Sequence, residues 1–163
     1  MALPDSCSGG GGAAAVPGGG GGTSSLIATG AQDGHIRIWD LRQRLNAHNL
    51  VAHEGGAVNE IGVTLGGAPA LVSVGADGRV LVLDPRAGFA PLFDFGRVTE
   101  DFIYSLLVLD DIAFTGDGRG KVTCFDVRGG HQRYVLDAGQ NAIRCLGATE
   151  TSLICAGDDG NAV

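Results

Sequence analysis

Several features of membrane, secreted and metal-binding proteins are missing from this sequence. No apolar run approaches the roughly 18 residues that a membrane-spanning helix needs, so no membrane association is predicted. The four cysteines show no C-x-x-C spacing, and there is no Asn-x-Ser/Thr sequon. These absences favour a reducing intracellular compartment, either cytoplasmic or nuclear.

Positive charge is also sparse. The chain has 11 Lys and Arg against 18 Asp and Glu, which gives a formal net charge of −7. Binding to a nucleic-acid backbone needs clustered Lys and Arg, and the only local basic cluster, Arg37, Arg42 and Arg44, is short. The sequence therefore argues against nucleic acid as the main partner.

The first 25 residues lack any sustained apolar pattern. They contain two glycine runs and have neither the basic start nor the apolar centre of a secretory signal. A phosphate-binding loop would need a preceding strand, a following helix and a lysine, and this segment has none of the three. We therefore expect residues 1–25 to form a disordered Gly/Ala-rich tail.

From Leu26 onward, one hairpin pattern recurs. In Leu26–Arg42, two strand-like runs flank the corner Asp33-Gly34, which tolerates positive φ at little steric cost. Short strands between Gly, Asp and Pro corners, without helical periodicity, predict an all-β fold. Related stretches are Ala70–Arg86, Ile112–Arg128 and Leu153–Val163, and the corner glycines Gly34, Gly78, Gly120 and Gly160 are 44, 42 and 40 residues apart.

A period of roughly 40–45 residues with a Trp-Asp ending is typical of a β-propeller blade, and from Leu26 onward the sequence resembles the WD-repeat family. The resemblance implies four-stranded blades with strands A to D, in repeats at about 26–42, 53–86, 98–128 and 138–163. The first repeat has glycines where strand A should be, and the fourth lacks most of strand C and all of strand D. Since ~4–8 blades close a ring, we expect residues 26–163 to form an incomplete propeller. It would be an open arc of three to four blades, part of a longer propeller.

The resemblance also implies a hydrogen-bonded tetrad in each blade. A His before strand A joins a Ser or Thr in strand B to an Asp at the B–C corner, and the hydroxyl accepts from a strand C Trp, so that buried polar groups are satisfied. The second repeat matches at His53, Ser73 and Asp77, with Leu83 in place of the Trp. The other repeats match in part, at Thr29, Asp33 and Trp39 in the first, Thr115 in the third and Asp159 in the fourth, while Val98 and Arg119 replace the His and the Asp of the third repeat.

His53, Ser73 and Asp77 are also the residue types of a hydrolase triad. The repeat pattern already assigns each of them a structural bond, and nothing in the sequence indicates an oxyanion hole. The remaining histidines do not lie at metal-ligand spacing. We therefore predict no enzymatic activity, no metal site and no cofactor.

The resemblance implies a non-catalytic scaffold that binds other proteins through the loops of its blades. Candidate contact residues are those that the structural assignments leave over. Phe102 stands out among them because a loop aromatic is a typical interface anchor. The candidates are Gln32 and Arg119 at B–C corners, and Glu54, Asp101 and Phe102 between strands D and A.

A second interpretation concerns the sequence Trp39-Asp40-Leu41-Arg42. It resembles the WD-x-R box of WD-repeat substrate receptors that dock on the adaptor of cullin–RING ubiquitin ligases, where the Arg helps to contact the adaptor. We carry that role only onto Arg42, since Leu83 and Phe125 replace the Trp in the related sequences that end in Arg86 and Arg128. The alternative is that the Arg simply caps the turn between strands C and D.

Overall fold

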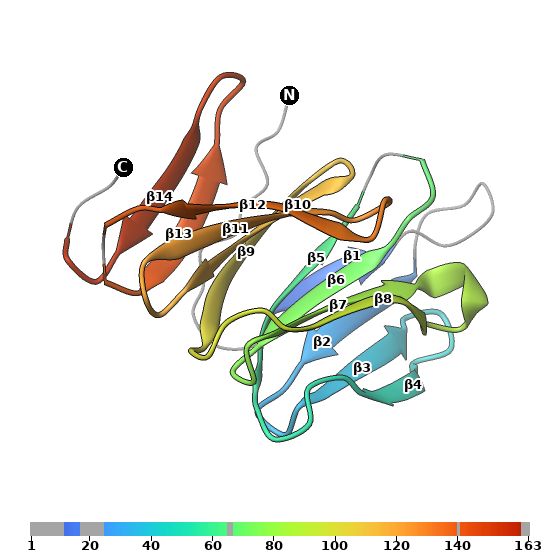
Figure 1. Cartoon of the computed structure of the whole chain (residues 1–163). Helices are drawn as coiled ribbons and strands as arrows, with labels where there is room; N and C mark the ends of the chain where they lie inside the picture. Colours follow the sequence, from blue (N-terminus) through green and yellow to red (C-terminus); the bar gives the residue numbers. More distant parts are fainter. Residues whose placement is uncertain (1–11, 17–24, 65–66, 140, 161–163) are drawn as a thin grey trace.

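The computed structural model describes residues 12–16, 25–64, 67–139 and 141–160, and these form antiparallel sheets that follow one another along the chain (Figure 1). The first sheet has the strands β1 (Ala13–Val16), β2 (Leu26–Gly30), β3 (His35–Asp40) and β4 (Leu45–Val51). The second has β5 (Val58–Val63), β6 (Leu71–Gly75), β7 (Arg79–Asp84) and β8 (Ala90–Arg97). The third has β9 (Ile103–Leu109), β10 (Ile112–Asp117), β11 (Lys121–Asp126) and β12 (His131–Asp137), and the fourth has β13 (Ile143–Ala148) and β14 (Leu153–Gly157).

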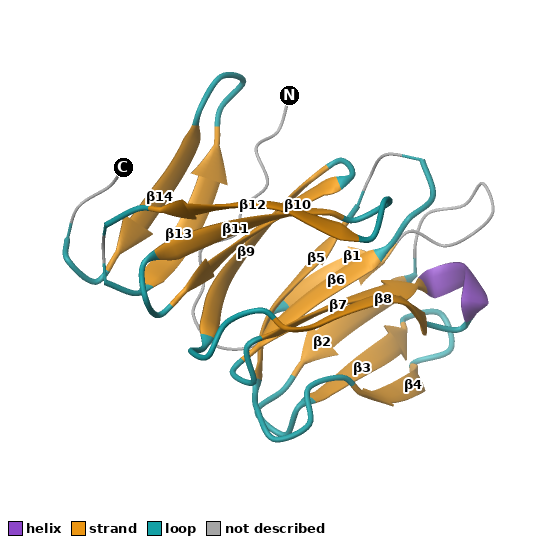
Figure 2. Cartoon of the chain, in the orientation of Figure 1, coloured by secondary structure: helices purple, strands orange, loops and turns teal. Residues whose placement is uncertain are grey.

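Each sheet is a simple meander, in which every strand pairs with the next one along the chain. The only helical element among the described residues is a 3₁₀ turn, η1 (Pro85–Ala87), between β7 and β8 (Figure 2). The four corner glycines have φ values of 79°, 73°, 77° and 79°, so the corner glycine has the same backbone conformation in each repeat. This confirms the all-β prediction of three to four blade-like sheets.

One expectation for the N-terminal segment is wrong. Ala13–Val16 form β1, which pairs with β2 and places Val16, fully buried, in the core. The short apolar AAAV run between the glycine runs supplies the strand A that the first sheet was expected to lack. The other residues of the expected tail, 1–11 and 17–24, lie outside the described residues, whereas Gly12 and Ser25 flank the strands.

The sheets stack face to face, and the first strand of each sheet makes the contact with the next sheet. The contacts run from β1 to β5, from β5 to β9 and from β9 to β13. Three apolar clusters fill the spaces between consecutive sheets. This is the radial packing of propeller blades, in which each sheet buries its faces only against its neighbours.

The second sheet shows how the sequence encodes this packing. Both of its central strands, β6 and β7, are almost entirely buried and read as continuous apolar runs. Alternate residues face opposite neighbours, as the two-residue period of a strand requires. Leu71, Leu81 and Leu83 pack against the first sheet, whereas Val72, Val74, Val80 and Val82 pack against the third.

Side chains on the first strands also bond to the backbone of the next sheet. Asn59 Nδ2 donates to the Ile103 carbonyl at 2.7 Å, and Ser105 Oγ donates to the Ile143 carbonyl at 3.0 Å. The Glu60 carboxyl accepts the N–H of Leu106. Burial raises the pKa of Glu60 to about 7, and the hydrogen bond from Leu106 offsets only part of that effect. These bonds satisfy backbone groups at the innermost strands, which have no partner strand on that side.

Candidate protein-interaction surface

The loops that connect consecutive sheets rest on the B–C corners, and the two sets of loops form one face of the molecule. The carbonyl of Gly34 accepts the N–H of His53, at 3.0 Å. Equivalent bonds run from Val98 to Gly78 and from Ala138 to Gly120. A β-carbon at Gly34 or Gly78 would collide with the carbonyl of the loop above, which, with the positive φ, explains why glycine occupies these corners.

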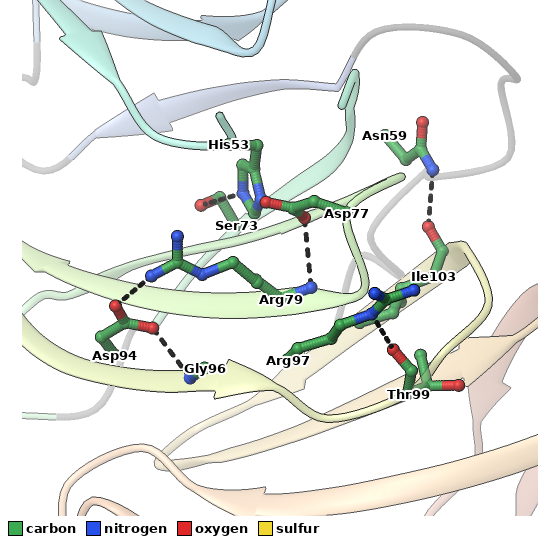
Figure 3. A network of polar contacts seen from close by, with 10 residues as sticks. All are labelled: His53, Asn59, Ser73, Asp77, Arg79, Asp94, Gly96, Arg97, Thr99 and Ile103. Atoms are coloured by element: carbon green, nitrogen blue, oxygen red, sulfur yellow. Dashed lines mark hydrogen bonds and ion pairs between the residues drawn. The ribbon is translucent and has the colours of Figure 1, made fainter. Parts of the chain in front are cut away.

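The buried polar network of the second sheet centres on His53 (Figure 3). Its Nδ1 lies 2.9 Å from Asp77 Oδ1, and its Nε2 lies 3.0 Å from Ser73 Oγ. Burial lowers the pKa of His53, which keeps the imidazole neutral, so Nδ1–H donates to the carboxylate and Nε2 accepts from the hydroxyl. The order Ser–His–Asp matches that of a hydrolase triad, but Ser73 and His53 are both 0% exposed, so no substrate reaches the hydroxyl.

The first sheet contains the hydrogen bond of the tetrad that joins the strand C Trp to the strand B hydroxyl. Trp39 Nε1 donates to Thr29 Oγ1 at 2.9 Å. Asp33 forms an ion pair with Arg37, accepts the N–H of His35 and lies 3.4 Å from Nδ1 of the same His35. The hydrogen bond from Arg37 is the largest of the effects that lower the pKa of Asp33 to about 2.

In the third sheet a hydrogen bond between a threonine and an aspartate takes the place of the His–Asp bond. Thr99 Oγ1 donates to Asp117 Oδ2 at 2.9 Å, and Asp117 Oδ1 accepts the N–H groups of Arg119 and Lys121. Thr115 is buried in β10. Sequence reasoning missed Asp117 because it lies two residues before the position where the repeat places its Asp.

In the fourth sheet an ion pair forms at the aspartate that precedes the predicted tetrad member. Asp158 accepts from Arg144 Nε at 2.8 Å and from Nη2 at 2.7 Å, whereas Asp159, the predicted tetrad member, is exposed. The hydrogen bond to Asp158 raises the pKa of Arg144, and the same bond lowers the pKa of Asp158.

The loop between β8 and β9 is fixed at several points. Arg97 Nε donates to the Thr99 carbonyl at 3.1 Å and its Nη2 donates to the Glu100 carbonyl at 2.9 Å (Figure 3 shows the first bond). The Asp101 carboxylate accepts the N–H of Phe102, whose carbonyl accepts the N–H of Gly118. Hydrogen bonds thus hold both the N–H and the carbonyl of Phe102 in place.

The bond from Gly118 to the Phe102 carbonyl recurs in two other sheets. Ala57 and Ala142 accept the equivalent N–H from the corners of the second and fourth sheets, at 2.9 and 3.1 Å. The position therefore has a fixed backbone, and its side chain differs between sheets. Ala142 is buried, whereas Phe102 projects from the surface with 48% of its area exposed.

Phe102 belongs to a small cluster of aromatic and charged side chains. Its ring meets that of Tyr104 edge-on, with 5.9 Å between the centroids. The Arg144 guanidinium lies over the Tyr104 ring, 3.9 Å from its centroid. An ion pair with Asp158 holds the guanidinium in this position. Tyr104 and Arg144 were not predicted as contact residues. They occupy the same position of β9 and β13, and a comparison of the aligned first strands could have indicated them.

The predicted contact residues divide between two ends of the sheets. Gln32, Glu54 and Arg119 are exposed on the loops of the same face as Phe102, and Asp101 is half-buried beside Gly118. Arg42 lies at the other end of its hairpin, on the turn between β3 and β4. The structure therefore separates the predicted scaffold surface from the WD-x-R turn.

The Asp-x-Arg sequence forms the same turn in three sheets. Oδ1 of Asp40, Asp84 and Asp126 accepts the backbone N–H of the residue two positions later, at 2.8, 2.9 and 3.1 Å. The side chain of Arg86 then bonds to Asp84, and that of Arg128 bonds to Asp111. Turn formation thus accounts for the recurrence of the Asp of the motif.

Three further features of the described residues bear on other kinds of site. No group of three or more His, Cys, Asp and Glu side chains is placed to hold a metal ion. No helix is long and apolar enough to cross a membrane. A groove of about 460 Å³ lies between β4 and the second sheet, where Leu50 and Phe89 line it and the Arg79–Asp94 ion pair borders it.

Comparison with known proteins identifies the fold and nothing more specific. No protein-family model and no curated protein sequence matches the chain. Among solved structures, the computationally designed Ika8 protein is similar over 87% of this chain and 43% of its own, with a TM-score of 0.75 and 20% identity. The designed Ika4 protein is similar over 86% and 84%, with a TM-score of 0.76 and 21% identity. Sqt1 of Saccharomyces cerevisiae is similar over 85% and 41%, with a TM-score of 0.70 and 20% identity.

The chain thus spans less than half of the length of Ika8 and Sqt1. The matched fold and the repeated sheets establish that it is built from blades of the β-propeller type.

Proposed function

We propose that this chain is a non-catalytic scaffold that binds another protein through the face formed by its D–A loops and B–C corners. The observation that carries the proposal is the presentation of Phe102. Its backbone is held by the same bond that holds an alanine in two other sheets, while its ring is half exposed beside Tyr104 and Arg144.

A fixed loop lowers the entropic cost of binding, because little ordering remains when the partner arrives. Arg97 and Thr99 hold this loop before any partner is present. Aromatic and arginine side chains are also the residue types that dominate binding energy at protein interfaces. We further propose that the protein acts inside the cell, as its cysteine spacing predicts.

Affinity capture followed by mass spectrometry tests the proposal with two matched variants. Phe102→Ala removes the exposed ring, and Leu92→Ala removes a side chain of similar exposure from the outer strand β8. We expect the wild type and Leu92→Ala to recover the same proteins, and Phe102→Ala to recover about 30-fold less, as for a hot spot of about 2 kcal/mol. Equal recovery by all three, with unchanged circular dichroism, would contradict the proposal.

A second candidate function is a substrate receptor of a cullin–RING ubiquitin ligase. Its support is the exposure of the turn that carries the WD-x-R sequence, where Trp39 is 39% and Leu41 is 56% exposed, and Arg42 is exposed as well. Recovery of the ligase adaptor by the wild type and by Arg86→Ala, but not by Arg42→Ala, would support this candidate. Equal recovery by all three would exclude a role for Arg42.

A further inference from the structure

The outermost strand of the third sheet, β12, presents an apolar edge to solvent. All seven of its residues are exposed, and three consecutive ones are apolar, with Tyr134 at 47%, Val135 at 45% and Leu136 at 47%. Among the described strands β12 pairs only with β11, so its other edge has backbone N–H and C=O groups without a partner strand. Such an edge is a template for pairing with another strand.

The outer strands of the first and second sheets differ from β12 in this respect. In β8, Pro91 lacks a backbone donor and Gly96 has a positive φ of 67°, and both interrupt regular pairing. In β4, the exposed large apolar side chains are Leu45 and Val51, at its two ends. Only β12, among these three outer strands, combines a contiguous apolar centre with an uninterrupted edge from Tyr134 to Asp137.

The backbone bonds of β12 define which groups face outward. The N–H of Ala138 donates to Gly120 in the corner next to β11, at 3.0 Å. Because successive N–H groups of a strand alternate in direction, those of Val135 and Asp137 point away from β11. Val135 therefore lies at the middle of the free edge.

We propose that β12 pairs in antiparallel register with β12 of a second copy of this chain, with the two-fold axis at Val135. In this register Val135 faces itself, and Tyr134 of each copy faces Leu136 of the other. Arg133 of each copy lies alongside Asp137 of the other. The segment RYVLD, residues 133–137, is thus complementary to itself about Val135, in both polarity and charge.

The β-bulge between β11 and β12 limits the extent of the pairing. The register shifts between Tyr134 and Gln132, which leaves Arg133 as the extra residue, and Arg133 also contacts Asp126 at 2.7 Å. Regular pairing therefore covers a short segment on either side of Val135, and a small interface gives weak association. The dimer is expected to be concentration-dependent and to leave the Phe102 face free, since β12 lies at the outer edge of its sheet.

Charge variants at the axis test this register directly. Two copies of Val135→Lys place like charges opposite each other, and so do two copies of Val135→Glu, whereas a mixture of the two places opposite charges there. Val51→Lys, at the exposed end of β4, is the control. Sedimentation velocity over a concentration series measures self-association of the full 163-residue chain, and circular dichroism verifies that each variant is folded.

We expect the wild type and Val51→Lys to dimerise with rising concentration, each Val135 variant to remain monomeric, and the mixture of Val135 variants to form a heterodimer. A wild type that stays monomeric over the whole series would overturn the proposal. Self-association of either folded Val135 variant at the wild-type level, or a mixture that stays monomeric, would overturn it as well.

Discussion

At the level of single residues, aspartates hold the turns of every four-stranded sheet. Asp33, Asp77 and Asp117 each accept the backbone N–H two positions later at a B–C corner. Their second contacts differ, since Arg37, His53 and Thr99 respectively supply them. A carboxylate at the corner is the feature that the three sheets share. A guanidinium, an imidazole or a hydroxyl makes the second contact with that carboxylate.

Glu60 gives the blade contact a specific pH dependence. Its folded-state pKa is about 7 against 4.5 for an unperturbed Glu, so the folded protein binds this proton more tightly than the unfolded chain. Its contribution to stability therefore falls as the pH rises from about 4.5 to 7 and is constant above that, a loss of about 2 kcal/mol after allowance for partial exposure. His53 acts in the opposite direction, because its lowered pKa costs stability as the pH falls below its ordinary value of 6.5.

The variant Glu60→Gln isolates the first effect, since Gln keeps an oxygen that accepts the Leu106 N–H and does not titrate. Urea unfolding at pH 5 and pH 8 should show the variant gaining stability relative to the wild type at the higher pH. His53 titrates in both proteins and cancels from the difference. If the free energy of unfolding changed equally with pH in the two proteins, ionisation of Glu60 would not destabilise the fold.

A corner glycine and a glycine after η1 allow steric collision to be separated from backbone strain. Gly78 has φ of 73° and a β-carbon there would collide with the Thr99 carbonyl, whereas Gly88 has φ of 65° and open space around it. Gly88→Ala should cost about 1 kcal/mol from the left-handed backbone alone. Gly78→Ala should cost at least twice as much, as measured by urea unfolding. Equal costs would mean that the loop above Gly78 moves freely.

At the level of elements, hairpins with buried alternation could be predicted and isolated short strands could not. The central hairpins combine β-branched runs with a glycine corner, and both signals lie within a few residues. β1 has four residues, AAAV, between Gly12 and Pro17, and only its pairing with β2 in the structure identifies it as a strand. Contacts between loops, such as Thr99 with Asp117 and Tyr104 with Arg144, join residues whose proximity depends on the packing of consecutive sheets.

The presence of β1 can be tested by two substitutions in neighbouring positions. Val16 is fully buried, and Ala15 next to it is exposed on the other face of the strand. Val16→Asp should lower the free energy of unfolding by at least about 2 kcal/mol, because it places a carboxylate in the apolar cluster. Ala15→Asp should change it by less than about 0.5 kcal/mol. Thermal unfolding that is equally unaffected by both would mean that residues 13–16 form no part of the core.

At the level of the whole molecule, stability should be shared between neighbouring sheets only. The apolar clusters and inter-sheet bonds join the first sheet to the second, the second to the third and the third to the fourth. In such a linear arrangement, the stability of the array is approximately a sum of nearest-neighbour contributions, and damage stays local. Ile143 and Ile36, both fully buried, lie in the last and the first of these clusters.

Ile143→Ala and Ile36→Ala therefore remove equivalent core contacts at opposite ends of the array of sheets. Each should cost about 2–5 kcal/mol locally. In native-state hydrogen exchange, Ile143→Ala should increase exchange in β13–β14 and then in the third sheet, while the amides of β2 and β3 keep their protection. Ile36→Ala should do the reverse, because the contacts that it removes lie between the first and second sheets. If either substitution raised exchange uniformly across all the sheets, the blades would unfold as one cooperative unit, and the inter-sheet bonds of Asn59, Glu60 and Ser105 would be strong enough to transmit the damage along the chain.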